Sequence, residues 1–94
     1  MRTLLFDQSF RRAVKRTCKN QPQLRLKIET ILALLEADPF APSLRTHKLK
    51  EDLENLWFCT VEYDCRIIFQ FHKLNGKTEE AIVLISVGSH NEVY

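Results

Sequence analysis

The stretch that decides the fold is residues 57–71, which read WFCTVEYDCRIIFQF. Apolar side chains alternate with other side chains on both sides of its middle, as they do in β-strands that bury one face. Tyr63 and Asp64 stand between the two alternating runs, so the stretch predicts an antiparallel hairpin. The side chains expected on its buried face are those of Trp57, Cys59, Val61, Ile67, Phe69 and Phe71.

This division of faces fixes the parity of the strand register. Paired residue numbers must sum to an even value, for example 62 with 66, because a slip of one residue would exchange the two faces. Glu62 and Arg66 then become cross-strand neighbours on the opposite face, with Asp64 at its rim. A lone arginine in an apolar strand requires a partner or solvent, so Arg66 indicates either a salt bridge or a functional cation.

Two helices are predicted ahead of the hairpin. The first begins after Asp7, which can cap it, and stops near Lys19. Arginine and lysine fill much of the surface between its apolar positions, which recur every four residues. The second begins near Pro22 and ends at Asp38, because a residue before proline avoids helical angles. The two apolar stripes are Phe6, Phe10, Val14 and Cys18, and Leu24, Ile28, Ile31, Leu32 and Leu35.

The remaining elements complete an α+β fold. Residues 3–6 form a short strand candidate, and residues 81–87 are so apolar that we expect a central strand covered on both faces. The order of elements predicts an N-terminal short strand and a two-helix hairpin packed on one face of a small antiparallel sheet. A chain of 94 residues suits a single domain spanning 1–94.

Composition narrows the class of protein. The first 50 residues hold 11 Lys or Arg against 4 Asp or Glu, whereas the others hold 3 against 8. The helical half is therefore basic, which suits a nucleic-acid backbone or an acidic partner, and the alternative is an ordinary solvated surface. No signal peptide or membrane-length apolar run is visible, so we expect a cytoplasmic location and no membrane contact.

The three cysteines, Cys18, Cys59 and Cys65, have no metal-type spacing. In the cytosol such residues are usually small buried apolar groups, so we expect neither a metal site nor a cofactor. The chain also lacks a glycine-rich phosphate loop, since its two glycines are Gly76 and Gly88.

Two histidines stand where a site could form. The last seven residues, 88–94, read GSHNEVY and place His90 and Tyr94 just beyond a predicted strand. His47 lies in a basic segment that also holds Arg45, Lys48 and Lys50. Each has an ordinary reading, since surface histidines, solvated basic loops and frayed terminal tyrosines are common.

Together these residue types suit metal-independent RNA cleavage. A base removes the proton of the 2′-hydroxyl, a cation stabilises charge on the phosphate, and an acid protonates the leaving 5′-oxygen. Histidine fits the acid or base role because its ordinary pKa is near 6.5. Arginine fits the phosphate because it donates two hydrogen bonds and keeps its charge. Tyrosine can stack on a base.

Four segments carry a resemblance to a known family. Residues 47–49, 56–57, 61–69 and 88–94 resemble, in this order, the RelE/ParE superfamily of toxin–antitoxin toxins, and within it the YafQ-like messenger-RNA endonucleases. The resemblance implies a RelE-like, microbial-RNase-like fold. It also implies a ribosome-dependent endoribonuclease, or mRNA interferase, which cuts mRNA to a 2′,3′-cyclic phosphate. A cognate acidic antitoxin would hold it inactive.

The resemblance also implies roles for individual residues. Thr60 departs from the pattern, because YafQ-like proteins carry a histidine near that place. This departure supports one alternative, a degenerate interaction domain. The other alternative is a ParE-like inhibitor of DNA gyrase without catalysis, because the shared fold alone does not decide the function. The expected catalytic residues are His90, Asp64, Arg66, His47 and Tyr94, with RNA contacts from Arg45, Lys48, Lys50 and Glu62.

Overall fold

The computed structural model describes residues 2–49, 55–73 and 80–89. Within these ranges the elements follow the predicted order, from a short strand through two helices to a meander of strands. Their bounds are β1 Leu4–Phe6, α1 Gln8–Thr17, α2 Pro22–Ala37, the 3-10 turn η1 Pro42–Leu44, β2 His47–Lys48, β3 Trp57–Glu62, β4 Cys65–Lys73 and β5 Glu80–Gly88.

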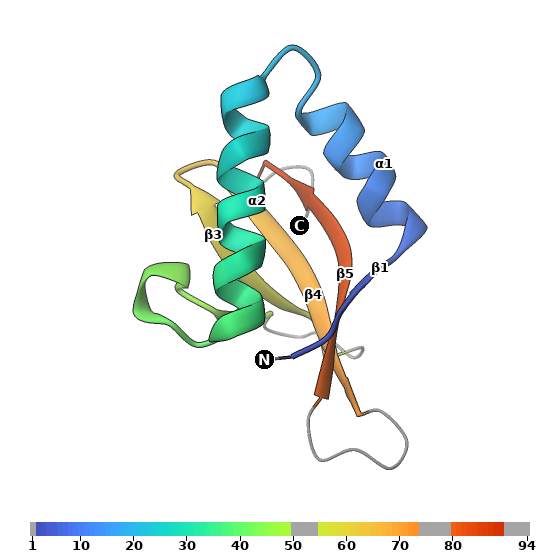
Figure 1. Cartoon of the computed structure of the whole chain (residues 1–94), viewed down its shortest axis with the longest axis vertical. Helices are drawn as coiled ribbons and strands as arrows, with labels where there is room; N and C mark the ends of the chain where they lie inside the picture. Colours follow the sequence, from blue (N-terminus) through green and yellow to red (C-terminus); the bar gives the residue numbers. More distant parts are fainter. Residues whose placement is uncertain (1, 50–54, 74–79, 90–94) are drawn as a thin grey trace.

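The described strands form one five-stranded sheet in the order β1-β5-β4-β3-β2. The α+β class is confirmed, and β5 is an interior strand as expected. The sheet is mixed, however, because β1 runs parallel to β5 while the other pairs are antiparallel. Figure 1 shows α1 and α2 side by side over one face of the sheet, joined by a short loop.

Local chemistry explains where the helices begin. Asp7 caps α1, and its carboxylate accepts hydrogen bonds from the Ser9 amide and the Ser9 hydroxyl. Both bonds lower the pKa of Asp7, and the bond from the Ser9 hydroxyl has the larger effect. Pro22 occupies the first turn of α2, where its missing N–H is no loss. No helix in the described part of the chain is long and apolar enough to cross a membrane.

The core fills the space between the helices and the sheet. The stripes of α1 and α2 meet the inward face of β3, β4 and β5, so burial of apolar surface holds the two layers together. The largest fully buried side chains are Phe10, Phe69, Ile28, Leu35, Leu44, Ile67, Ile82, Leu84, Val87, Pro39 and Cys59.

The strand register is confirmed in parity and corrected in detail. Trp57 faces Phe69 and Thr60 faces Arg66, so the paired numbers sum to an even value. The register then shifts between Thr60 and Glu62, and Glu62 pairs with Cys65. The expectation that Glu62 neighbours Arg66 on one face is therefore wrong. The extra residue in β3 redirects Glu62, because a bulge reverses the alternation of side chains beyond it.

Candidate functional site

Three side chains gather on the sheet face opposite the helices. The Arg66 guanidinium carbon lies 5.3 Å from the centre of the Phe58 ring, in cation–π geometry. The His47 imidazole stacks on the same phenyl ring, with centroids 5.8 Å apart and planes 23° apart. Neighbouring strands supply all three side chains. His47 of β2 pairs with Phe58 of β3, and Arg66 of β4 pairs with Thr60 of β3. The Phe58 ring therefore brings imidazole and guanidinium into one small region.

A backbone carbonyl orients the His47 ring. Its Nδ1 lies 2.6 Å from the carbonyl oxygen of Arg45. A carbonyl oxygen only accepts hydrogen bonds, so Nδ1 carries the proton and Nε2 of the neutral ring keeps its lone pair. Arg45 itself has a left-handed backbone, with φ 51° and ψ 46°, at the end of η1. This turn of the chain aims the Arg45 carbonyl at the imidazole.

The β3–β4 turn meets the end of β5. Asp64 lines a cavity of about 350 Å3 together with Ser89 and with Arg16 from α1. Arg66 also pairs with Gly88 across β4 and β5. The chain therefore passes beside Arg66 at residue 88, and residue 89 faces the same cavity as Asp64. His90 is the next residue, and it lies outside the described residues together with Lys50 and Tyr94.

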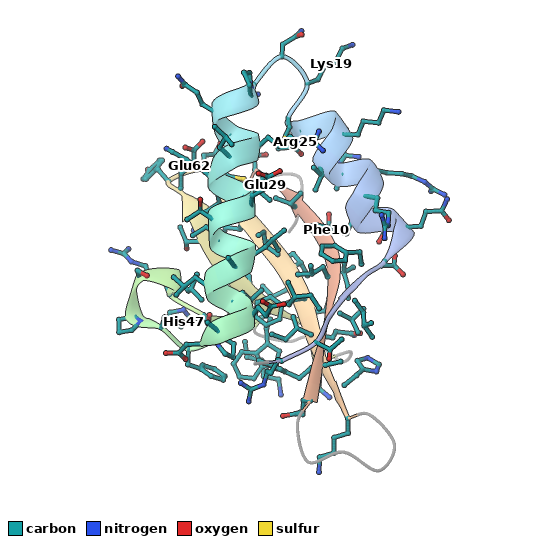
Figure 2. All side chains as sticks on the ribbon, in the orientation of Figure 1. Phe10, Lys19, Arg25, Glu29, His47 and Glu62 are labelled. Carbon is teal, nitrogen blue, oxygen red and sulfur yellow. The ribbon has the colours of Figure 1, made fainter. Side chains whose placement is uncertain are left out.

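Two other predicted RNA contacts, Lys48 and Glu62, are not among the residues that contact the Phe58 ring. Lys48 pairs with Trp57 and so points to the helix-facing side of the sheet, whereas its neighbour His47 points to the opposite side. Glu62 forms an ion pair with Lys27 of α2, with 2.8 Å between Nζ and Oε2. Figure 2 shows Glu62 beside α2 and His47 in the segment that follows α2. The structure thus brings His47 and Arg66 to one ring, with the Arg45 carbonyl against His47. Lys48 faces the other side of the sheet, and Glu62 lines the cavity of Asp64.

Two residues of the site were missed in the sequence. Phe58 was not named from the sequence as a site residue, although the expected register places it on the same face as Arg66. Arg16 was assigned to the general basic surface of α1, and it lines the cavity beside Asp64. An amphipathic pattern shows that a helix has a basic face but does not show which cation meets the sheet.

The three cysteines pack in or against the core, and Cys65 also lines the cavity beside Asp64. Burial raises the pKa of the Cys59 thiol to about 12, and the nearby Cys65 sulfur acts in the same direction. Cys18 is half-buried, and burial raises its pKa as well. Among the described residues, no three histidine, cysteine, aspartate or glutamate side chains come together as ligands of a metal ion would.

Several solved structures of bacterial toxins share this architecture. YafQ of Escherichia coli BL21(DE3) is 18% identical over 100% of this chain and 99% of its own, with a TM-score of 0.75. A chain of the E. coli DinJ–YafQ complex is 21% identical over 100% and 99% of the two chains, again with a TM-score of 0.75. A metal-bound toxin from Helicobacter pylori is 28% identical over the full length of both chains, with a TM-score of 0.72.

The comparison with curated proteins gave no match. A family model described as the bacterial toxin of a type II toxin–antitoxin system, YafQ, matches residues 2–94. This match spans every described element, from β1 to the end of β5, and includes the segment that carries His90 and Tyr94. The chain therefore belongs to the YafQ family of type II toxin–antitoxin toxins.

Proposed function

We propose that this toxin is a ribosome-dependent endoribonuclease that cuts mRNA and so stops translation in the cytoplasm. Its reaction would be the attack of a 2′-hydroxyl on the adjacent phosphorus, with no metal ion in the chemical step. The products would be a 2′,3′-cyclic phosphate and a free 5′-hydroxyl.

One observation carries the proposal, namely the shared contact of His47 and Arg66 with the Phe58 ring. The imidazole and guanidinium cannot be farther apart than the sum of their two distances to that ring. A phosphodiester bound between them would meet a proton acceptor on one side and a fixed cation on the other. These are the groups that in-line cleavage of RNA requires.

Each group then has a distinct task in the proposed step. The Nε2 lone pair of His47 accepts the 2′-hydroxyl proton, the new O2′–P bond forms, and the P–O5′ bond breaks. Arg66 donates to the phosphate oxygens as negative charge gathers on them. His90, two residues beyond the partner of Arg66, protonates the leaving O5′. Asp64 orients His90, and Tyr94 stacks on the substrate base.

The test is cleavage of end-labelled mRNA on programmed ribosomes. We expect the wild-type toxin to release a fragment that ends in a 2′,3′-cyclic phosphate, recognised because its 3′ end is ligated only after mild acid opens the ring and a phosphatase removes the phosphate. Loss of a preorganised donor typically slows such a step by about 100-fold or more. We therefore expect that loss for Arg66→Ala, and comparable losses for His47→Ala and His90→Ala.

A matched control is available in the third histidine. His72 is exposed and contacts Gln70 through Nε2, at the opposite end of β4 from Arg66. We expect His72→Ala to cut at the wild-type rate. Intact mRNA with the wild-type toxin would refute the proposal, and double-strand DNA breaks alongside it would identify a gyrase inhibitor instead. Equal losses for His72→Ala and His47→Ala would remove the case for a specific site.

We also propose that a cognate acidic antitoxin covers the toxin. The family match and the likeness to a chain of the DinJ–YafQ complex support a partner of this kind. The outer surface of α1 is rich in cations, among them Arg11, Arg12 and Lys15, and no acidic residue stands in its first turn. Co-expression of an adjacent small acidic open reading frame should restore growth and yield a stable complex on size-exclusion chromatography.

A further inference from the structure

A second cavity lies far from the β3–β4 turn, on the helix-facing side of the sheet. Its volume is about 320 Å3, and it lies where β3 begins and β4 approaches its end. Aromatic rings and cations dominate its wall. The residues that matter for its chemistry are Arg2, Phe40, Lys48, Trp57, Phe71 and Glu80.

Three aromatic rings form one wall of this cavity. Phe40 stacks on Phe71 with centroids 5.8 Å apart and planes 18° apart. Trp57 meets both rings edge-on, at 5.7 Å from Phe40 and 5.5 Å from Phe71. Trp57 and Phe71 pack against the core, but Phe40 remains 54% exposed. An exposed ring held in place by two anchored ones offers a rigid surface on which a flat group can stack.

Two cations stand beside that aromatic wall. The Arg2 guanidinium carbon lies 5.7 Å from the centre of the Phe71 ring. The buried Nε of Arg2 has no hydrogen-bond partner among the residues that the structure describes, which is uncommon for a buried donor. Lys48 is exposed on the two-residue edge strand β2. An anionic group bound in the cavity would lie beside both cations.

We propose that this cavity binds one nucleotide of single-stranded RNA, with its base stacked on Phe40 and its phosphate held by Arg2 and Lys48. Stacking plates beside cations are the usual means of binding single-stranded nucleic acid. The Glu80 carboxylate accepts hydrogen bonds, so it can receive one from an N–H group of the base. The inference deepens the proposed function, because it takes RNA as the ligand.

The position of the cavity favours RNA over a protein side chain. Lys48 directly follows His47, and the two side chains point to opposite faces of β2. In the described part of the sheet β2 is the outermost strand, so a single strand of RNA bound at His47 can turn around this edge. The next nucleotide along the strand then reaches the cavity.

The chain carries a built-in probe for this site. Trp57 is its one tryptophan, and it lines the cavity. We would titrate the full-length toxin with hexanucleotides of adenosine, cytidine or uridine whose 2′-hydroxyls are methylated, so that no cleavage occurs. Quenching of Trp57 emission reports stacking at the cavity, and fluorescence anisotropy of an end-labelled hexamer reports total binding.

We expect saturable quenching by these hexamers. Loss of one stacking ring costs about ten-fold in affinity, so Phe40→Ala should weaken binding by that amount. Lys48→Ala should weaken it and reduce its dependence on salt. The matched controls are Leu26→Ala, which truncates an exposed apolar side chain of α2, and Lys19→Ala. Figure 2 places Lys19 on the loop that joins the helices, away from His47.

Several outcomes would overturn the inference. They are the absence of quenching, quenching that survives both Phe40→Ala and Lys48→Ala, and quenching by a glutamate-rich peptide but not by RNA. If Phe40→Ala fails to fold, Lys48→Ala still decides. The Arg66→Ala variant separates this inference from the proposed function, because it should keep the quenching while losing cleavage. Normal cleavage by the wild-type toxin without quenching would refute RNA binding at this cavity and leave the proposed function intact.

Discussion

Replacement of Phe58 by leucine is the sharpest test of the proposed site. Leucine keeps the apolar bulk but removes the ring that both His47 and Arg66 contact. A cation–π contact and an aromatic stack each contribute about 1 kcal/mol at partly exposed positions. Their loss should cost about 1–2 kcal/mol, which lowers the melting temperature of a domain of this size by roughly 5–15 °C.

The same change should slow cleavage on programmed ribosomes by about ten-fold at saturating ribosome concentration, because both reacting groups lose a common support. Binding to the ribosome should not change, so the effect falls on kcat rather than on KM. Phe6→Leu is the matched control. Phe6 lies on β1, and the Arg11 guanidinium carbon is 5.6 Å from the centre of its ring in the same cation–π geometry. We expect Phe6→Leu to lose stability but not activity. Equal kcat values for Phe58→Leu and wild type would refute the reasoning.

Three further predictions concern stability and reactivity. Because the pKa of Asp7 is lowered in the folded protein, its cap stabilises α1 above pH 3.8, and this contribution is lost as the pH falls through the lower folded pKa. In urea unfolding, the stability of Asp7→Asn should therefore depend less on pH below 4 than the stability of the wild type does. Cys59 should resist iodoacetamide at pH 8 while Cys18 reacts, as mass spectrometry would detect, because burial holds the Cys59 pKa at about 12. A double-mutant cycle on Lys27 and Glu62 should give a coupling of only about 0.2–1 kcal/mol, because both side chains are partly exposed; a larger value would mean that water screens the pair less than its exposure indicates.

Much of the fold follows from periodicity. The alternation in residues 57–71 predicted the hairpin and the parity of its register, since only one parity buries all the apolar side chains together. The four-residue spacing in the helices predicted the stripe that contains Phe10 and the one that contains Ile28, and both residues lie in the core. These signals are strong because burial selects residue type at every second or every fourth position.

The departures occur where a single residue interrupts the pattern. Val61 is the extra residue before Glu62 in β3, and Ile85 is the extra residue between Leu84 and Ser86 in β5. Both are apolar and β-branched, so they continue a strand pattern and conceal the bulge from any reading of the sequence. The parallel pairing of β1 was missed for a related reason, because a three-residue strand does not reveal its direction.

The site was predictable in chemistry but not in geometry. Residue types and the family resemblance identified His47 and Arg66, which the structure brings to one ring. Nothing in the sequence indicated that the Arg45 carbonyl would bond Nδ1 of His47, because that contact depends on a left-handed residue after η1. Lys48 was grouped with His47 as a neighbour in sequence, yet one step along a strand moves a side chain to the other face.

The pairing of β1 with β5 constrains how the protein folds during its synthesis as well as its final structure. Residues 4–6 leave the ribosome early, yet their partners, residues 82–84, emerge only after most of the described chain has been made. The sheet cannot close during most of its own synthesis, because no other described strand offers β1 a place. The parallel pair of β1 and β5 therefore cannot form until β5 has left the ribosomal exit tunnel.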